Sequence, residues 1–363
     1  MMAGTQHHKI VLPYKSNMKG LRILFLSHRF SPDIGGIEVH SEILANSFAQ
    51  AGHEVRLVTW TPTTGNKTFT FAVVRNPGPF QLIKEHRWAD VVFENNPSVR
   101  LAWPQVLFRR PLIVALHTWI ARTNGKVSLL DKLKTRRLAN AKKVIACSNA
   151  VRLRCWPSAV VIENPYQENL FRILPAISRQ KDFVFLGRLV SDKGADLAIN
   201  AIRKFISAEE ETNLRSQQVS LTIIGNGPEK ENLEKLVRQL DLEHNVTFKG
   251  ALSGDKLVEC LNEHRFILVP SVWEEPFGMV ALEGMACGCV PIVADSGGLP
   301  AAVGGAGLTF QRGNVDSFVS TIREVFGNEE LEKKLRKAAT DHLSLHQQQP
   351  ISMRYLKIIE EVV

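Results

Sequence analysis

The sequence lacks long apolar runs and has few cysteines. Its longest apolar stretches, such as 112–116 and 266–269, have the length of strands, whereas a membrane-spanning helix needs about 20 apolar residues. The N-terminus has no apolar segment with a small-residue cleavage site, so we expect no signal peptide and a cytoplasmic location. The five cysteines form no C-x-x-C pair, which argues against a zinc or thioredoxin-like motif and favours buried, reduced thiols.

Three further motifs that the sequence lacks narrow the enzyme class and the partners. No G-x-G-x-x-G follows the first predicted strand, which argues against a nicotinamide oxidoreductase. No D-x-D stands at a strand end, and we predict no metal ligands. The positive charge comes with neither an aromatic-rich basic platform nor a recognised binding motif, so we expect no nucleic-acid partner.

The length and the apolar pattern predict two α/β domains. With 363 residues, 44% of them hydrophobic and 22% charged, the chain is an ordinary globular mixture that is long enough for two cores. Short apolar strands alternate with amphipathic helices, which is typical of doubly wound parallel sheets. We predict strands at 21–27, 54–59, 90–94, 112–117 and 144–147, and again at 183–186, 221–224, 246–248, 266–269 and 290–294. Helices are predicted at 37–50, 129–141, 195–207, 230–239, 257–261, 315–326 and 331–345.

The two predicted domains are joined by a stretch at 164–182 that has two prolines and no clear period. We therefore expect an N-terminal extension at 1–18, a Rossmann-like domain at 19–170, a second at 171–349 and a C-terminal helix at 350–363 that crosses back. Ligands of open α/β sheets bind beyond the carboxyl ends of the strands, so the site is expected in the cleft between the domains.

The net charge of +9 is unevenly distributed. Residues 1–170 contain 23 Lys and Arg against 10 Asp and Glu, a net charge of +13, whereas residues 171–363 contain 22 against 26, a net charge of −4. The first domain is therefore predicted to be basic and the second mildly acidic.

The densest group of chemically useful residues follows the predicted strand 266–269. Glu275 stands in a loop with Pro and Gly, and a helix that carries Glu283 begins near Gly278 or Met279. The start of that helix offers free N–H groups and a positive dipole end to an anion. Glu283 has apolar neighbours, where a carboxylate without a partner is costly. The alternative is an exposed helical Glu beside an acidic loop.

Two other strand ends carry candidate residues for binding a phosphate. Gly187 and Arg188 follow the first strand of the second domain and Lys193 lies five residues after Arg188, so the two cations could neutralise a diphosphate. Gly35 and Gly36 precede a helix after the first strand of the chain, where the backbone can approach a phosphate closely. The alternatives are solvated surface charges and an ordinary tight turn.

His117 stands directly after the strand 112–116 and is expected to point into the cleft. A lone His is often structural, so both interpretations stay open on the residues alone.

These motifs resemble those of the retaining glycosyltransferases of family 4, from about residue 19 to the end of the chain. The match rests on the E-x7-E segment from Glu275 to Glu283, with support from the loops at 187–194, 31–38 and 51–55. The family has the GT-B fold, in which two Rossmann-like domains face each other across a cleft. The chain departs from the family at 164–167, where Asn-Pro-Tyr-Gln replaces the common Asn-Gly-hydrophobic-Asp, and no role is carried over for the missing Gly and Asp.

The resemblance also implies roles for particular residues. Glu283 is expected to hold the ribose, Arg188 and Lys193 the diphosphate, and Glu275 and His117 the donor sugar. The remaining residues expected to contact the nucleotide sugar are Gly35, Gly36, Gly187, Gly225, Phe277, Gly278, Met279 and Val280. A front-face reaction, in which the leaving phosphate helps to deprotonate the acceptor, is the favoured account in the family. Because Arg188 and Lys193 would neutralise the diphosphate as a metal does, we predict metal-independent turnover and no cofactor besides the nucleotide-sugar donor. We expect a UDP-sugar, since these are the commonest donors in such families.

Two other functions remain open: a sugar-nucleotide epimerase or hydrolase on the same scaffold, and a catalytically silent nucleotide-binding subunit. The acceptor is expected to be a saccharide or a lipid-linked saccharide of polysaccharide or glycoconjugate synthesis.

The excess of basic residues in the first domain predicts a peripheral contact with an anionic membrane, on the cytoplasmic face. Candidates are Lys126, Lys132, Lys134, Arg136, Arg137, Lys142 and Lys143, with Leu129, Leu130, Leu133 and Leu138 turned inward or toward lipid. The alternative is a solvated helix that packs on its own sheet.

Overall fold

The structure of the protein is a computed structural model that describes residues 20–33, 35–63, 67–120, 128–211 and 219–363. The chain forms two compact units. The first runs to Ala115 and adds Leu129–Val144 and Ser352–Val363, and the second comprises Leu116–Ser128 and Ile145–Ile351. The predicted N-terminal extension and Lys126 lie outside the described residues.

The first sheet is built from strands whose apolar side chains are buried on both faces. In β4 and β5 every residue is buried, as expected for a parallel sheet covered by helices. The strand order is β3-β2-β1-β4-β5-β6-β7. The strands are β1 (Arg22–Ser27), β2 (Glu54–Thr59), β3 (Ala72–Arg75), β4 (Val91–Asn95), β5 (Leu112–Leu116), β6 (Lys143–Ala146) and β7 (Val160–Val161).

Most helices that accompany the first sheet connect its strands, whereas α14 follows the last strand of the chain. Phe25 of β1, Phe48 of α1 and Phe93 of β4 form an aromatic cluster in the core of the first unit, with ring centroids 4.9 to 6.3 Å apart. α1 is followed by Gly52, whose φ of +98° suits glycine at a helix end. The helices are α1 (Gly36–Gln50), α2 (Pro79–Trp88), α3 (Val99–Ala102), α4 (Gln105–Phe108), α5 (Leu129–Ala139), α6 (Asn149–Cys155) and α14 (Gln348–Val362).

The second sheet has the strand order β10-β9-β8-β11-β12-β13. Its described strand pairs are all parallel, and β12 is buried along its whole length. The strands are β8 (Lys181–Leu186), β9 (Leu221–Ile224), β10 (Val246–Gly250), β11 (His264–Val269), β12 (Val290–Ala294) and β13 (Leu308–Phe310).

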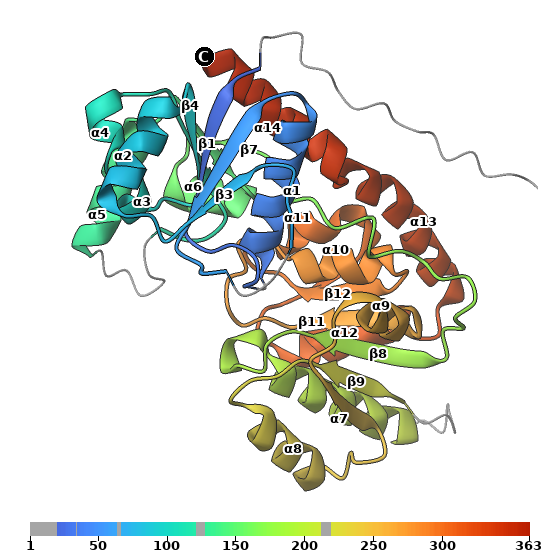
Figure 1. The fold of residues 1–363 in the computed structure, drawn as a ribbon. Helices are drawn as coiled ribbons and strands as arrows, with labels where there is room; N and C mark the ends of the chain where they lie inside the picture. Colours follow the sequence, from blue (N-terminus) through green and yellow to red (C-terminus); the bar gives the residue numbers. More distant parts are fainter. Residues whose placement is uncertain (1–19, 34, 64–66, 121–127, 212–218) are drawn as a thin grey trace, which may run out of the picture. The chain divides into compact units, whose positions relative to one another are not determined.

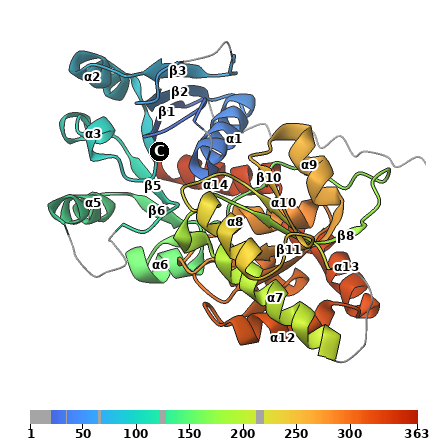
Figure 2. The same ribbon diagram turned by 90° about the horizontal axis from the view of Figure 1, so that it is seen from below.

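Helices cover both faces of the second sheet. Figure 1 shows α10 on one side, where it packs on β11 and β12, and α7 on the other, where it packs on β9. Figure 2 shows α7 running beside α12. The helices are α7 (Ala195–Glu211), α8 (Lys230–Gln239), α9 (Gly254–Asn262), α10 (Met279–Ala286), α11 (Leu299–Val303), α12 (Val315–Val325) and α13 (Glu329–Leu345). Two short 3-10 helices are η1 (Ser191–Lys193) and η2 (Gly304–Ala306).

Both sheets thus share the Rossmann strand order, which confirms the predicted pair of doubly wound α/β sheets. In each sheet the order reverses between two neighbouring strands, β1 and β4 in the first and β8 and β11 in the second. Ligands of such sheets bind at this switch point, beyond the carboxyl ends of the strands. The switch point of each unit is therefore the place to look for a site.

Several elements differ from the sequence-based prediction. The short strands β3, β7 and β13 and the helix α2 were not expected, because they are short or have no clear apolar period. α5 ends at Ala139 rather than at residue 141, and β11 begins two residues earlier than predicted. None of the described helices combines the length and the apolar composition that a transmembrane segment requires.

Candidate active site

Two charged side chains meet at the switch point of the second sheet. Lys193 follows β8 and Glu275 follows β11, and the Nζ of Lys193 lies 2.5 Å from Oε1 of Glu275. The buried Ser271 donates a hydrogen bond from its Oγ to the same carboxylate oxygen at 2.8 Å. Within the described chain, both contacts fall on Oε1. The carboxylate is therefore fixed in place while its Oε2 is left for another donor.

Backbone contacts join the two loops that carry this ion pair. The N–H groups of Val272 and Trp273 both donate to the carbonyl of Asp192, each at 3.0 Å. Gly194 has a φ of +72°, and a Cβ at this position would lie 2.1 Å from the carbonyl oxygen of Pro270. Only glycine allows the two backbones to approach this closely. The position of Lys193 beside Glu275 is therefore set by the backbone.

The neighbouring loops pack against each other in the same way. A Cβ on Gly225, which follows β9, would lie 1.8 Å from the carbonyl oxygen of Gly187, which follows β8. A Cβ on Gly297, which follows β12, would lie 2.2 Å from the carbonyl oxygen of Glu275. Glycine at 225 and 297 therefore lets the loops pack closely, whereas a Cβ on Gly187 would make only ordinary contact with Phe185.

The helix α10 begins beside this group. Gly278 precedes its first residue with a φ of +128°, and no side chain of the described residues caps the helix start. Met279 and Val280, in the first turn, are half-buried. Their N–H groups lie at the positive end of the helix dipole, which would stabilise an anion bound there. Phe277 is instead buried, and its ring packs against that of His346 with centroids 6.0 Å apart.

Glu283 is a half-buried carboxylate on α10, where Ala281, Leu282 and Met285 are buried. Burial raises the pKa of Glu283 from 4.5 to about 7, because the charged form loses its hydration. Among the described residues, no side chain or backbone group forms a hydrogen bond or an ion pair with this carboxylate that would offset the loss. A ligand that donates hydrogen bonds here would favour the ionised form.

His117 lies at the carboxyl end of β5 and is buried. Its Nδ1 lies 3.0 Å from Oδ1 of Asn164, and burial lowers the pKa of His117 to about 4. The ring is therefore neutral near pH 7. Because the amide oxygen of Asn164 can only accept, Nδ1 carries the proton and Nε2 carries the lone pair. Two residues on, the Nε1 of Trp119 donates to the carbonyl of Glu274 at 2.8 Å, which connects this segment to the loop before Glu275.

For three residues predicted for the site, the described part of the chain shows no hydrogen bond or ion pair to this group. Arg188 is exposed, and no ion pair or side-chain hydrogen bond of Arg188 is found in the described part of the chain. Gly35 and Gly36 begin α1 at the carboxyl end of β1 and so belong to the switch point of the first unit. Their roles remain predictions.

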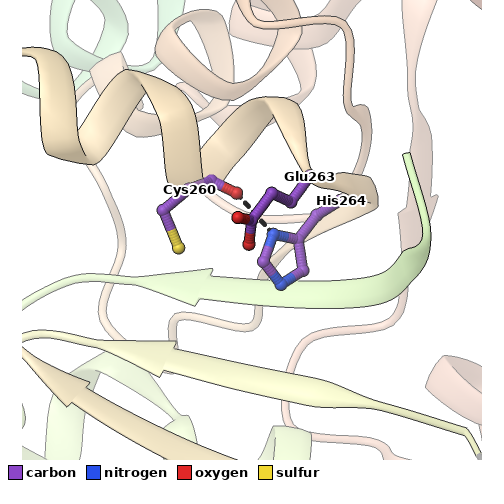
Figure 3. Close-up of side chains that lie close together, drawn as sticks. All are labelled: Cys260, Glu263 and His264. Atoms are coloured by element: carbon purple, nitrogen blue, oxygen red, sulfur yellow. Dashed lines mark hydrogen bonds between the residues drawn. The ribbon is translucent and has the colours of Figure 1, made fainter. Parts of the chain in front are cut away.

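A second cluster of polar side chains lies away from the switch point, at the start of β11. Figure 3 shows Cys260, Glu263 and His264, whose ligand-type atoms lie within 4.8 Å of one another. The Nδ1 of His264 is 2.6 Å from the carbonyl oxygen of Cys260, and its Nε2 is 2.7 Å from Oγ1 of Thr222 on β9. Burial lowers the pKa of His264 to about 4. With both ring nitrogens already partnered, this neutral histidine ties β11 to β9 and has a structural role.

The comparisons with known proteins identify the family of the chain. Residues 167–342 match the family described as glycosyl transferases group 1, and residues 34–155 match glycosyltransferase family 4. An uncharacterized glycosyltransferase of Methanocaldococcus jannaschii is 30% identical over 361 residues, covering 92% of this chain and 96% of that protein. The chain belongs to the group 1 glycosyltransferases.

Other relatives are matched over part of their length. A D-inositol 3-phosphate glycosyltransferase of Acidothermus cellulolyticus is 30% identical over 270 residues, or 65% of this glycosyltransferase. The chain spans 58% of that relative, and 31% of a second Methanocaldococcus jannaschii glycosyltransferase that it matches at 36% identity. Among solved structures, HepE of Anabaena in complex with UDP-glucose is similar with a TM-score of 0.75 at 20% identity, covering 94% and 100% of the two chains. This likeness shows that the glycosyltransferase has the GT-B class of fold.

The sequence interpretation missed several residues of this candidate site. Ser271 could have been found, because it stands directly after a predicted strand, as catalytic and binding residues often do. Asn164 could not, because it lies 47 residues from its partner His117. The link from Trp119 to the loop before Glu275 spans 155 residues and left no sequence signal.

Proposed function

We propose that this glycosyltransferase moves a sugar, with retention of anomeric configuration, from a UDP-sugar to a saccharide or lipid-linked acceptor in polysaccharide or glycoconjugate synthesis. The observation that supports this most is the ion pair of Lys193 and Glu275 at the β8/β11 switch point, with Glu283 on the adjoining helix. A nucleotide sugar presents a diphosphate, ribose hydroxyls and sugar hydroxyls together. A cation and two carboxylates are the complementary groups.

The leaving group is the nucleoside diphosphate, on which negative charge builds as the glycosidic bond breaks. We assign its stabilisation to Lys193, Arg188 and the N–H groups at the start of α10. Preorganised charges that face the developing charge lower the barrier. These groups supply the neutralisation that a divalent ion supplies elsewhere, which supports metal-independent turnover.

Glu283 is assigned to the ribose. Two neighbouring hydroxyls can donate to its carboxylate, and these bonds would replace the hydration that burial removes. Because binding favours the ionised form, the nucleotide would lower the pKa of Glu283 from about 7 and release protons near neutral pH.

Glu275 and His117 are assigned to the sugar. Glu275 is held by Lys193 and Ser271, an arrangement that suits a hydrogen-bond acceptor for sugar hydroxyls better than a mobile nucleophile. His117 is neutral with the lone pair on Nε2, so it accepts a hydrogen bond at that nitrogen. The acceptor hydroxyl then attacks from the same face as the departing phosphate, which takes its proton.

A UDP donor is supported by HepE, whose structure contains UDP-glucose, and by no single residue of this chain. The test is a thermal-shift panel of UDP-, ADP- and GDP-sugars on the whole protein. A ligand at 100 times its dissociation constant stabilises the folded state by about 2.7 kcal/mol. Product analysis with the best donor, with and without a chelator, then reports the linkage formed and the metal requirement. If no nucleotide sugar shifts the melting temperature, the proposal fails.

Two other functions use the same site. An epimerase or hydrolase would consume the donor without an acceptor, and a silent subunit would bind it without turnover. Donor consumption that depends strictly on an added saccharide separates the transferase from both.

We also propose that the first unit docks on an anionic membrane surface. Its helices α2, α4 and α5 expose large apolar side chains, among them Phe80 (88% exposed), Val106 (70%) and Leu129 (75%). Figure 1 shows these helices gathered on one side of the first sheet. Of the leucines predicted to face either lipid or the core, Leu129, Leu130 and Leu133 are exposed and Leu138 is buried.

Basic residues accompany this apolar surface. Lys132, Arg136, Lys142 and Lys143 are exposed, whereas Arg137 is engaged with the carboxylate of Glu94. Each cation near an anionic leaflet contributes about 1 kcal/mol. Co-sedimentation with anionic and neutral vesicles at two salt concentrations tests the contact. Equal, negligible binding to both would leave the basic residues as a solvated face.

A further inference from the structure

Two arginines contact the carboxylate of Glu274, the residue before Glu275, and a tryptophan donates to its backbone carbonyl. The Nη1 of Arg154 donates to Oε2 of Glu274, and the guanidinium of Arg154 lies over the ring of Trp119 at 4.8 Å from its centroid. The Nη1 of Arg312 lies 3.0 Å from Oγ of Ser296 and 3.5 Å from Oε1 of Glu274. All of these residues belong to the second unit.

The cluster stands where ligands of this sheet bind. Glu274, Ser296 and Arg312 follow β11, β12 and β13, which are neighbours in the sheet, so all three lie beyond the carboxyl ends of adjacent strands. Lys193 comes from β8, on the opposite side of β11. The cluster therefore flanks the proposed sugar position on the side away from the proposed diphosphate position.

The charges of the cluster do not balance. Two guanidinium groups share one carboxylate, which leaves an excess of one positive charge. Each guanidinium has five N–H donors, and in the described chain only one nitrogen of Arg154 and one of Arg312 form the side-chain contacts given above. Arg154, Arg312 and Glu274 keep 35%, 41% and 35% of their side-chain surface exposed. Unused donors at an exposed, net positive site suit a planar or tetrahedral oxyanion.

Trp119 helps to fix the position of Arg154 before any ligand binds. It is buried, its Nε1 donates to the carbonyl of Glu274, and its ring supports the guanidinium of Arg154. Arg154 is thus held in place by the Trp119 ring and by the carboxylate of Glu274. Glu274 occupies the position that an incoming anion would take between the two arginines.

We propose that Arg154 and Arg312 form a subsite for an anionic group, a phosphate or a carboxylate, carried by the acceptor, and that Glu274 holds the subsite until the acceptor displaces it. This inference rests on the proposed transferase function. It adds the class of acceptor: a saccharide or lipid-linked saccharide with a negative charge near the hydroxyl that is glycosylated. The anion takes over the bonds of both arginines, and the carboxylate of Glu274 turns to solvent.

The test is a titration of the whole protein with inorganic phosphate in the presence of saturating UDP, which occupies the diphosphate position. The signal is the indole N–H resonance of Trp119, identified with Trp119→Phe. We expect phosphate to shift this resonance in the wild type. Arg154→Gln and Arg312→Gln should each weaken phosphate binding about tenfold, the loss of roughly one charge-assisted hydrogen bond. Arg152→Gln is the matched control on the same helix, because Arg152 bonds Asn149 and not Glu274, and it should change nothing.

The decisive variant is Glu274→Gln. If Glu274 competes with the anion, its neutral replacement should tighten phosphate binding several-fold, opposite in direction to the arginine variants. If the cluster only fastens the loop, all three variants should lower the melting temperature and leave phosphate binding alone, which would overturn the proposal.

Two further measurements show whether a negative result refutes the proposed function or only the acceptor subsite. UDP binding, measured in the same samples by thermal shift, should be equal in all variants, and its absence in the wild type would refute the proposed function and not this subsite. UDP-glucuronate and UDP-glucose should bind alike. A preference for UDP-glucuronate that Arg312→Gln removes would place the anion on the donor sugar and overturn the acceptor assignment.

Discussion

The two switch points share a strand order but differ in the polar groups that occupy them. In the first unit, the buried Ser27, Ser41 and Asn95 form a neutral network. Oγ of Ser27 lies 2.9 Å from Oγ of Ser41, which accepts from Nδ2 of Asn95 at 2.7 Å. In the second unit, Lys193 and Glu275 form a half-buried ion pair. The first network joins α1 to β1 and β4, whereas the second presents charge at the surface.

This difference shows what the shared fold leaves open. The same strand order supports a buried, neutral set of hydrogen bonds in one unit and a half-buried, charged group in the other. Function therefore has to be argued from the side chains at each switch point and not from the topology. If the second switch point carries the chemistry and the first is structural, substitutions at the second should lower turnover and substitutions at the first should lower stability.

The largest loss of turnover in a protein that stays folded is expected for Lys193→Ala. Loss of this cation should lower kcat by about 100- to 1000-fold, because it removes one preorganised charge that faces the leaving diphosphate. The measurement is steady-state turnover with the best donor, with circular dichroism to confirm folding. A folded Lys193→Ala protein with near-normal kcat would contradict the diphosphate assignment.

Glu283→Gln should weaken binding of UDP-glucose by about 10- to 100-fold, since it removes charge-assisted hydrogen bonds to the ribose. In the wild type the affinity should rise with pH through about 7, the pKa of Glu283, because binding requires the carboxylate. UDP-glucose itself does not titrate there, so calorimetry at several pH values isolates the protein group. A pH dependence that persists in the variant would refute the assignment.

Glu283→Gln should also change how the stability of the unliganded protein depends on pH. The folded pKa of Glu283 lies above its ordinary value, so the folded state binds more protons than the unfolded state between about pH 4.5 and 7. Part of the stability of the unliganded wild type is therefore lost as the pH rises through that window. In Glu283→Gln this loss should be absent, which urea unfolding at pH 5 and pH 8 can measure.

Asn164→Ala should lower kcat by about tenfold with little effect on donor affinity. Without the amide oxygen, the ring of His117 is no longer held with its lone pair on Nε2. Asn164→Asp retains an acceptor for Nδ1 and should recover part of the rate. The assignment is wrong if both variants behave alike.

The smallest effect is expected for Ser41→Ala in the first unit. It should cost about 1 kcal/mol of unfolding free energy, the usual contribution of a hydrogen bond, because Nδ2 of Asn95 loses the nearer of its two acceptors and keeps the carbonyl of Ile37. UDP-glucose affinity should stay unchanged. A change of affinity without a change of stability would move part of the site into the first unit.

The fold was predictable from sequence where apolar runs are continuous. The strands β2, β9 and β12 and the helix α8 have the bounds that the apolar pattern predicts, because burial on one or both faces fixes their composition. β13 has three residues and α2 has charged residues on several sides, so neither has a period to detect.

Local motifs in the sequence point to some residues of the candidate site, but not to how they are arranged. Glu275, Glu283 and Lys193 stand in local motifs, so the sequence names each of them. Their contacts depend on backbone packing between loops that lie 82 residues apart in the chain, as for Lys193 and Glu275. The excess of positive charge around Glu274 could not be predicted from the sequence for the same reason, since Arg154 lies 120 residues before Glu274.

The helix α14 also has a consequence for the order of events during biosynthesis. Its Tyr355 is fully buried in the core of the first unit, with its ring 5.9 Å from that of Phe93 and 5.4 Å from that of His40. A ribosome makes this segment only after the entire second unit. The first unit to leave the ribosome therefore waits, with an uncovered aromatic core, until the second has been made.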